Sequence, residues 1–245
     1  MQLFVSDLHL SVDRPDKLEL FQRFAARAAQ VASKLYILGD LFEVWLGDDD
    51  DTPEHRAIVE ALAGLSAAGV AVYFMHGNRD FLCGADFSTQ TGATLLPDYA
   101  TIELDGQCAV LTHGDLLCTR DVKYQRFRRV VRHPLVRRLF LAVPLASRRR
   151  IAFGTRTRTV ASMESKDTEI MDVDSATVAE VLRRHAATLL IHGHTHRPAM
   201  HAVAVDGRAC QRVVIGDWYC DDDVLIYDNG RLSKMRVGDF VATDD

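Results

Sequence analysis

The sequence predicts an α/β protein, and three observations lead to this prediction. Short apolar runs of the kind that form buried strands alternate with segments of helical period in the N-terminal part of the chain. Small groups of polar residues follow these apolar runs directly. The length of 245 residues suits one large α/β domain or two small ones.

The N-terminal part is predicted to form successive strand–helix units. The expected elements are strands at residues 1–5, 34–38 and 70–75 and amphipathic helices at residues 15–33 and 53–68. The acidic run 48–51 lacks the alternating ligands and the closing Glu of an EF-hand, so we expect a solvated loop there. Residues 93–111 carry turn signals and are predicted to add two or three sheet strands.

Residues 120–185 have helical character and break this alternation. Within them, residues 133–146 are apolar, basic residues precede and follow this stretch, and Arg137 and Arg138 interrupt it. The stretch is too short and too broken to span a bilayer. It can lie at a membrane surface or line a groove for acyl chains. It can also be a core helix whose arginines extend to solvent, and the pattern leaves both interpretations open.

The C-terminal part is predicted to return to sheet structure. Residues 155–166 are expected to be a flexible polar segment, and residues 176–186 a helix that leads to an apolar strand at 188–191. After His196 the chain is predicted to be all-β, with strands at residues 201–205, 211–215, 224–227 and 232–237.

Composition excludes some classes of function. The apolar fraction of 48% is ordinary for a protein with a sizeable core, and the net charge of −5 gives no global case for nucleic-acid binding. No stretch approaches the ~20 apolar residues of a membrane span, and no signal peptide is expected. Five scattered cysteines fit free thiols in a reducing cytoplasm.

Polar side chains of metal-ligand type follow the predicted strands. They are Asp7, His9, Asp40, Asn78, His113, His194 and His196. Asp7 and His9, like His194 and His196, are two residues apart and can face one point, and we expect Gly193 to let the backbone turn sharply. Open α/β sheets bind ligands at the carboxyl ends of their strands.

These seven nitrogen and oxygen ligands are too many for one tetrahedral zinc, which takes four. They suit two metal ions roughly 3.5–4 Å apart that share a bridging carboxylate, and mixed His, Asp and Asn ligation fits Mn, Fe, Co or Zn. Such a pair clamps a phosphoryl group and lowers the pKa of a water molecule. The predicted reaction class is therefore metal-assisted hydrolysis of a phosphoester or phosphoanhydride.

Five ordered motifs resemble those of the calcineurin-like metallophosphoesterases. The motifs are Asp7-Leu8-His9, Gly39-Asp40, Gly77-Asn78-Arg79-Asp80, His113-Gly114-Asp115 and Gly193-His194-Thr195-His196. The resemblance implies a four-layer α-β-β-α sandwich of two mixed sheets flanked by helices. It further implies one domain over residues 1–245 that includes a helical lid insertion at 121–170. One metal would be held by Asp7, His9 and His196, the other by Asn78, His113 and His194, and Asp40 would bridge them.

Arg79 departs from the third motif of many phosphatases in this superfamily, where a His is thought to protonate a poor leaving group. An Arg cannot serve as a general acid near pH 7, because its pKa exceeds ~12, but it can clamp a phosphate. The leaving group should therefore already be a good one, such as another phosphate. This favours a pyrophosphate bond over an alkyl phosphoester.

Longer segments resemble the UDP-2,3-diacylglucosamine hydrolases of lipid A biosynthesis. They are residues 4–10, 39–45, 77–82, 113–115, 170–173 and 192–198, with Asp121, Tyr124 and Gln125. The resemblance implies water attack on the α-phosphorus of UDP-2,3-diacylglucosamine, which gives UMP and 2,3-diacylglucosamine 1-phosphate (lipid X), with two divalent ions, most often Mn²⁺. The helical insertion would then cap the site and enclose the acyl chains.

The resemblance also assigns residues to roles. It implies a catalytic set of Asp40, Asn78, Arg79 and His113 and substrate contacts from Asn78, Arg79, Asp121, Thr159, Met163, Lys166 and His194. Thr159 and Met163 differ from the Ser and Asn expected in this family. The expected partners are the UDP-linked diacylated lipid and the cytoplasmic face of a bacterial inner membrane, to which the protein would bind peripherally as a monomer, with no nucleic acid.

Two other functions remain open from the sequence. One is a different dimetal enzyme, such as a cyclic-nucleotide phosphodiesterase, a protein phosphatase or a nucleotide pyrophosphatase. The other is a non-catalytic scaffold of the same fold, although such a chain should have lost ligands. We expect His76 and His192 to be structural, Trp45 to pack in the core, and Asp115 to orient a metal ligand.

Overall fold

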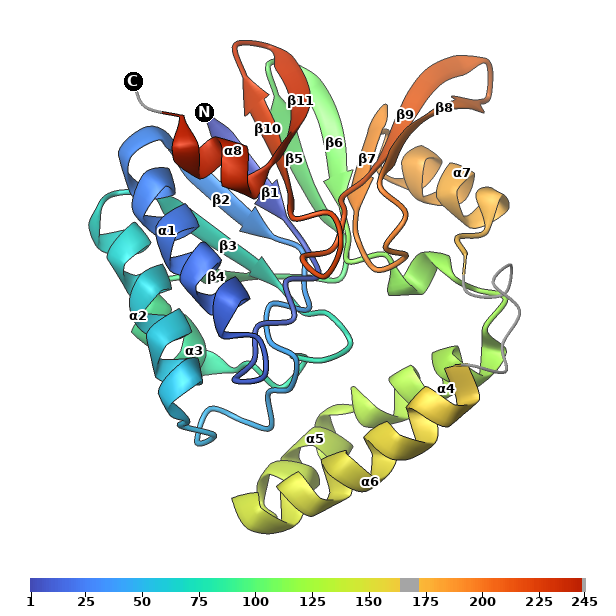
Figure 1. Cartoon of the computed structure of the whole chain (residues 1–245). Helices are drawn as coiled ribbons and strands as arrows, with labels where there is room; N and C mark the ends of the chain where they lie inside the picture. Colours follow the sequence, from blue (N-terminus) through green and yellow to red (C-terminus); the bar gives the residue numbers. More distant parts are fainter. Residues whose placement is uncertain (164–171, 244–245) are drawn as a thin grey trace.

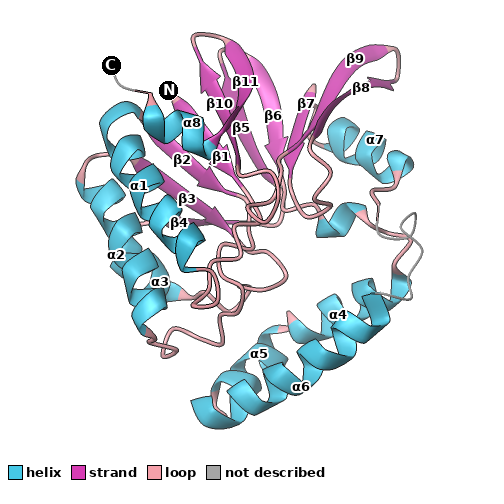
Figure 2. Cartoon of the chain, viewed as in Figure 1, coloured by secondary structure: helices cyan, strands magenta, loops and turns pink. Residues whose placement is uncertain are grey.

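The computed structural model describes the backbone of residues 1–163 and 172–243, and the side chains of these residues except 155–163. Two mixed sheets face each other (Figures 1 and 2). The first has the order β11-β10-β1-β2-β3-β4, in which β1 to β4 are parallel. Its strands are β1 (Gln2–Val5), β2 (Lys34–Ile37), β3 (Ala71–Met75), β4 (Thr94–Leu96), β10 (Asp223–Asp228) and β11 (Arg231–Arg236).

The second sheet has the order β5-β6-β7-β9-β8, in which β6, β7 and β9 are parallel. Its strands are β5 (Ala100–Leu104), β6 (Gln107–Leu111), β7 (Leu189–His192), β8 (Ala199–Val205) and β9 (Arg208–Val214). Helices α1 (Pro15–Val31), α2 (Pro53–Ala67), α3 (Ala85–Thr91) and α8 (Val237–Ala242) cover the first sheet, and α7 (Ser175–Arg184) covers the second (Figure 2). The expected four-layer arrangement is confirmed.

Alternating side chains along the strands fill the three spaces between the four layers. On β1, Leu3 and Val5 point to the helices, whereas Phe4 points to the second sheet. Phe4 stacks on Tyr36 of β2 with ring centroids 4.8 Å apart, and Tyr36 stacks on Tyr73 of β3 at the same distance. Phe4, Tyr36 and Tyr73 are register partners on adjacent strands, and aromatic pairs of this kind contribute about 0.5–1.5 kcal/mol beyond the area they bury, so they stabilise this register.

Three helices form the insertion between β6 and α7. They are α4 (Val122–Val131), α5 (Pro134–Leu141) and α6 (Leu145–Met163), preceded by a short 3-10 turn, η1 (Asp115–Leu117). They lie apart from the sheets, beyond the loops that follow the strands (Figure 1). Residues 155–163 belong to α6, so the prediction of a flexible polar segment from residue 155 is wrong for this part. None of the described helices has an apolar stretch long enough to cross a bilayer.

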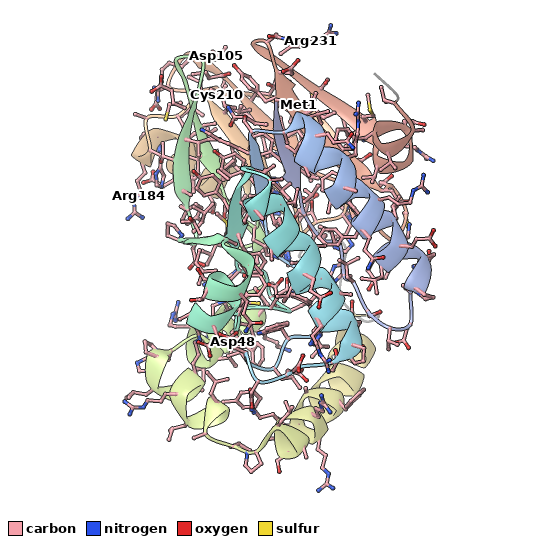
Figure 3. All side chains as sticks on the ribbon, turned by 90° about the vertical axis from the view of Figure 1, so that its left-hand side faces the viewer. Met1, Asp48, Asp105, Arg184, Cys210 and Arg231 are labelled. Carbon is pink, nitrogen blue, oxygen red and sulfur yellow. The ribbon has the colours of Figure 1, made fainter. Side chains whose placement is uncertain are left out.

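The prediction of a solvated loop at residues 48–51 holds for Asp49 and Asp51, which are 60% and 61% exposed, and is wrong for Asp48 and Asp50. Asp48 accepts hydrogen bonds from the backbone N–H groups of Gly84, Asp86 and Phe87 and so caps α3. Asp50 is buried and accepts a 2.7 Å hydrogen bond from Arg149. In Figure 3, Asp48 lies between the helices of the sandwich and those of the insertion. The run therefore joins these two parts of the chain.

Arg148 anchors the far end of the insertion. Its side chain is only 2% exposed, and its guanidinium donates to the carbonyl groups of Val143 and Leu46 and to the carboxylate of Asp49. Gly47 makes this approach possible, because a Cβ on Gly47 would collide with the guanidinium of Arg148. The start of α6 is therefore fixed to the loop that follows β2.

Candidate metal centre

The predicted ligands lie in the loops directly after β1, β2, β3, β6 and β7, whose carboxyl ends converge (Figure 1). Five of them have left-handed backbone conformations: Asp7, His9, Asp40, His194 and His196 have φ between 48° and 68°. Such conformations are uncommon outside glycine and cluster at functional sites. Asp7 and His9 face one point as expected, but through left-handed turns instead of extended strand. His194 and His196 do not, because His194 lies at Asn78 and His196 lies at Asp7.

The first cluster consists of Asp7, His9 and His196, whose ligand atoms all lie within 4.8 Å of one another. His196 Nε2 is 3.3 Å from Asp7 Oδ1, and His9 Nε2 is 3.9 Å from the same oxygen. Burial alone would lower the pKa of His196, but its hydrogen bonds to Asp217 and Asp7 raise this pKa to about 10. Burial alone would raise the pKa of Asp7, yet His196, His113 and His9 bring it below its usual range.

The second cluster consists of Asn78, His113 and His194. The amide oxygen of Asn78 lies 3.1 Å from His113 Nε2 and 3.1 Å from His194 Nδ1. Burial and the neighbouring His113 lower the pKa of His194 to about 4, which keeps its imidazole neutral. A neutral imidazole is the form that binds a metal ion.

Asp40 lies between the two clusters. Its Oδ2 atom is 3.8 Å from His9 Nε2 and 3.9 Å from His113 Nε2. Its other oxygen, Oδ1, accepts a 2.8 Å hydrogen bond from the backbone N–H of Arg79. The carboxylate is 2% exposed, so its orientation is fixed in the interior.

The donor atoms fit divalent cations. His9 Nε2 is buried and has no hydrogen-bond partner among the described residues, although carboxylate oxygens of Asp7 and Asp40 lie 3.8–3.9 Å away. A polar atom left in this way is costly unless another group satisfies it. Two imidazole nitrogens also converge on the oxygen of Asn78. A set of imidazole, carboxylate and amide donors suits Mn²⁺, Fe²⁺, Co²⁺ or Zn²⁺.

Glycines allow the loops to approach one another closely. A Cβ on Gly77 would overlap Asp40 Oδ1, and a Cβ on Gly193 would overlap Asp7 Oδ2. Gly39 has φ +91°, and a Cβ there would lie 2.8 Å from His113 Nδ1. The chain turns sharply after β7, as predicted, and the Thr195 N–H donates a 2.8 Å hydrogen bond to the Gly193 carbonyl. The left-handed residue of this turn is His194, so Gly193 is required for space and not for its φ.

Several carboxylates that position the ligands were missed in the sequence. Asp217 Oδ2 lies 3.1 Å from His196 Nδ1, and Glu43 Oε2 lies 3.2 Å from His9 Nδ1. Tyr219 donates a 2.6 Å hydrogen bond to the same Glu43 oxygen. Asp80 accepts from the backbone N–H groups of Gly77 and Leu41 and so ties two motif loops together. Glu43 and Asp80 lie within the motif segments, so their positions could have been found from the sequence. Asp217 follows Gly216 in what looks like an ordinary turn, and nothing in the sequence marks it as a functional residue.

Other predicted residues lie around these clusters. The Arg79 side chain is 30% exposed, and its Nη1 lies 3.7 Å from Glu43 Oε1. Asp121 caps α4 by accepting a 3.1 Å hydrogen bond from the Tyr124 N–H. Lys166 lies outside the described residues, and the side chains of Thr159 and Met163 are likewise outside the description, although both residues belong to α6.

Asp115 was predicted to orient a metal ligand. Its carboxylate accepts 2.6 Å hydrogen bonds from Tyr124 Oη and Arg128 Nε, so it joins the loop of His113 to the insertion. The imidazole of His113 is itself oriented by the carbonyl of Leu38, which lies 2.8 Å from His113 Nδ1. His76 and His192 are structural, since each contacts a backbone carbonyl and burial lowers the pKa of each. Trp45 packs in the core, 5% exposed.

Comparisons with known proteins agree with this geometry. The family model described as calcineurin-like phosphoesterase matches residues 2–198. A UDP-2,3-diacylglucosamine hydrolase of Aeromonas salmonicida is 49% identical over 96% of this chain and 93% of its own length. Proteins of the same name from Aromatoleum aromaticum and Stenotrophomonas maltophilia are each 46% identical, over 98% and 94% of this chain and 99% and 96% of their own lengths.

Proposed function

Because the chain belongs to the family of UDP-2,3-diacylglucosamine hydrolases within the calcineurin-like phosphoesterases, we propose that it hydrolyses the pyrophosphate bond of UDP-2,3-diacylglucosamine. The structural observation that carries this proposal is the position of Asp40 between two clusters of nitrogen and oxygen donors, with its carboxylate held by the backbone N–H of Arg79. Asp40, Asn78, Arg79 and His113 form the proposed catalytic set.

The proposed reaction adds one water molecule across the pyrophosphate. The water oxygen bonds to the α-phosphorus, and the bond from this phosphorus to the bridging oxygen breaks. The bridging oxygen leaves with the β-phosphate as 2,3-diacylglucosamine 1-phosphate, and UMP is the other product. The two protons of the water pass to the product phosphates and to solvent. A phosphate leaves without being protonated first, so Arg79 in place of an acid fits this bond.

We propose that the site holds two divalent ions and that these are Mn²⁺. One would be held by the first cluster and the other by the second, and Asp40 would be a ligand of both. Bound there, they would neutralise the phosphates and acidify a water molecule. The chain fixes the donors beforehand, since Glu43, Asp217 and the carbonyl of Leu38 each face the other ring nitrogen of a ligand histidine. Arg79 would hold a phosphate oxygen of the substrate.

The helical insertion would hold the acyl chains. Leu135 and Leu139 on α5 are 65% and 71% exposed, and Phe127 on α4 and Phe153 on α6 also expose more than half of their surface. Exposed apolar side chains on this scale mark interaction surfaces. Substrate contacts are proposed for Asn78, Arg79, Asp121, Thr159, Met163, Lys166 and His194. The same apolar face, with its arginines, would place the protein peripherally on the cytoplasmic side of a bacterial inner membrane as a monomer.

The deciding experiment measures UMP release from UDP-2,3-diacylglucosamine with Mn²⁺, with a chelator, and with UDP-N-acetylglucosamine as the unacylated control. We expect UMP only from the lipid and only with metal. Equal rates on both nucleotides would retain the metal chemistry and contradict the lipid substrate. No release from either nucleotide would contradict the proposed function.

Arg79→Ala tests the phosphate clamp. Removing a fixed charge that stabilises the transition state costs about 10²–10³-fold in turnover, so we expect a loss of this size with Mn²⁺ binding unchanged. Steady-state kinetics and metal analysis on the same sample measure both. Unchanged kinetics would exclude Arg79 from the substrate site.

A further inference from the structure

We infer that helix α4 of the insertion is a structural part of the second cluster and that Arg132, its C-terminal cap, positions Asn78. The inference rests on the proposed metal centre. In this role α4 supports the proposed metal ligands, in addition to any part it has in covering the substrate. Both loops that supply Asn78 and His113 are bonded to side chains of α4, as described next.

Arg132 holds the loop of Asn78 directly. Its Nη2 donates a 2.6 Å hydrogen bond to the carbonyl oxygen of Gly77, and this carbonyl belongs to the peptide bond that joins Gly77 to Asn78. Its Nη1 donates a 3.0 Å hydrogen bond to Asp98, and its guanidinium carbon lies 5.6 Å from the ring centroid of Phe81. The side chain is 13% exposed. Because the guanidinium contacts Gly77, Asp98 and Phe81 together, it fixes the orientation of the peptide bond that precedes Asn78.

The loop of His113 is held by the preceding turns of α4. Tyr124 Oη and Arg128 Nε both donate to Asp115 Oδ2 at 2.6 Å, two residues after His113. Gln125 donates a 2.7 Å hydrogen bond to the backbone carbonyl of Asp115. The ring of Tyr124 also lies 6.1 Å from the ring of His194. One face of α4 therefore contacts the surroundings of all three residues of the second cluster.

The rest of the insertion is attached elsewhere. Arg148 and Arg149 at the start of α6 contact Leu46, Asp49 and Asp50, in the loop that follows β2. Arg132 and Arg148 are thus comparable, because each is an arginine of the insertion that donates to backbone carbonyl oxygen and to one carboxylate of the sandwich. Of the two, Arg132 is the one that donates to a residue adjacent to a candidate ligand.

The test titrates the whole chain, stripped of metal and without substrate, with Mn²⁺. Isothermal calorimetry gives the affinities, and the electron paramagnetic resonance of bound Mn²⁺ separates a coupled pair from a single ion. We expect two ions in the wild type. Arg132→Met should weaken one of them about 10–100-fold, the usual cost of losing a group that orients a ligand. Arg132→Lys should recover part of this loss, because an ammonium group still donates to the Gly77 carbonyl.

Two further variants separate the possible outcomes. Arg148→Met loosens the insertion at its other end and should bind two ions as tightly as the wild type. Asp98→Asn removes the charge of the 43% exposed carboxylate that pairs with Arg132. It should lower the affinity for the same Mn²⁺ ion as Arg132→Met does, but by a smaller factor. If Arg132→Met does not fold, this variant tests the role of Arg132.

Three results would overturn the inference or its premise. Folded Arg132→Met with two ions at wild-type affinity would refute the role of α4 while leaving the proposed function intact. Equal weakening by Arg148→Met would also refute it, because general loosening of the insertion would then explain the loss. A wild type that binds no Mn²⁺ would instead contradict the proposed metal centre.

Discussion

The first and second clusters share Asp40 but are held in place by different parts of the chain. The first cluster is supported by the sandwich itself, through Glu43 after β2 and Asp217 after β9. The second cluster depends on helix α4, which enters the chain only with the insertion. A site that looks symmetrical in its ligands is therefore asymmetrical in what makes it rigid.

The two clusters also differ in charge. The first contains the carboxylate of Asp7 and has Glu43 and Asp217 directly behind its imidazoles. The second has the neutral amide of Asn78 and two imidazoles. Because carboxylates attract a cation more strongly than neutral donors do, we expect the first cluster to bind its ion more tightly.

Replacing Asp40 should have the largest effect, because both clusters share this residue. Asp40→Ala takes one ligand from both clusters, so we expect turnover at the background rate and loss of both ions. Metal analysis after dialysis, together with UMP release, measures this. Near-normal activity would show that Asp40 does not bridge the clusters.

Glu43→Gln should affect the first cluster alone. The change keeps the size of the side chain but removes the charge that faces His9 Nδ1, so we expect the tighter Mn²⁺ site to weaken about 10–100-fold. Calorimetry measures it, and Glu103→Gln on the exposed face of β5 is the matched control. If Glu43→Gln lowered the affinity of the weaker Mn²⁺ site instead, the assignment of Glu43 to the tighter site would be contradicted.

Arg148→Met should alter stability without altering either cluster. Breaking a buried ion pair can cost about 3–5 kcal/mol, but the carboxylate of Asp49 is 60% exposed and returns to water. We therefore expect a loss of about 1–3 kcal/mol in the free energy of unfolding, mainly from the unpaired Leu46 carbonyl. Denaturant unfolding measures it, with exposed Arg150→Met as the control, for which about 0.5 kcal/mol or less is expected. Equal stabilities of the two variants would contradict the anchoring role.

The smallest effect is expected at the surface of α5. Leu135→Ser with Leu139→Ser changes two exposed side chains, so metal binding and folding should remain as in the wild type. The KM for the diacylated substrate should rise about threefold to tenfold, roughly the equivalent of 1 kcal/mol of lost apolar contact. Hydrolysis of bis(p-nitrophenyl) phosphate is the control, and a parallel loss on this unacylated ester would make the effect structural.

The sequence predicted the strands along the chain and brought out the seven candidate ligands, because both depend on local patterns. A strand is recognised from a few apolar residues, and its ligands follow within the next few positions. The supports of the ligands come from distant parts of the chain. Asp217 lies in a loop after β9, and only folding brings it 3.1 Å from His196. No local pattern distinguishes it from an ordinary turn residue.

The errors have the same physical origin. Helix α3 contains three Ser or Thr residues and is short, so its own propensity is weak; it is capped by Asp48, which lies 36 residues before Gly84. Helix α8 has six residues and was missed, because the chain after His196 was predicted to be all-β. The acidic run appeared solvated because its partners, Arg148 and Arg149, are separated from it by 99 residues.

The left-handed turns at Asp7, His9, Asp40, His194 and His196 have a consequence for protein engineering. Each of these backbones is less favourable for an L-residue than for glycine, by about 1–2 kcal/mol before local hydrogen bonds are considered. Selection for heat resistance alone should therefore enrich Gly or Asn at these positions. Variants selected for a higher melting temperature would therefore lose candidate metal ligands, and with them hydrolytic activity, at the positions where substitution stabilises the fold most.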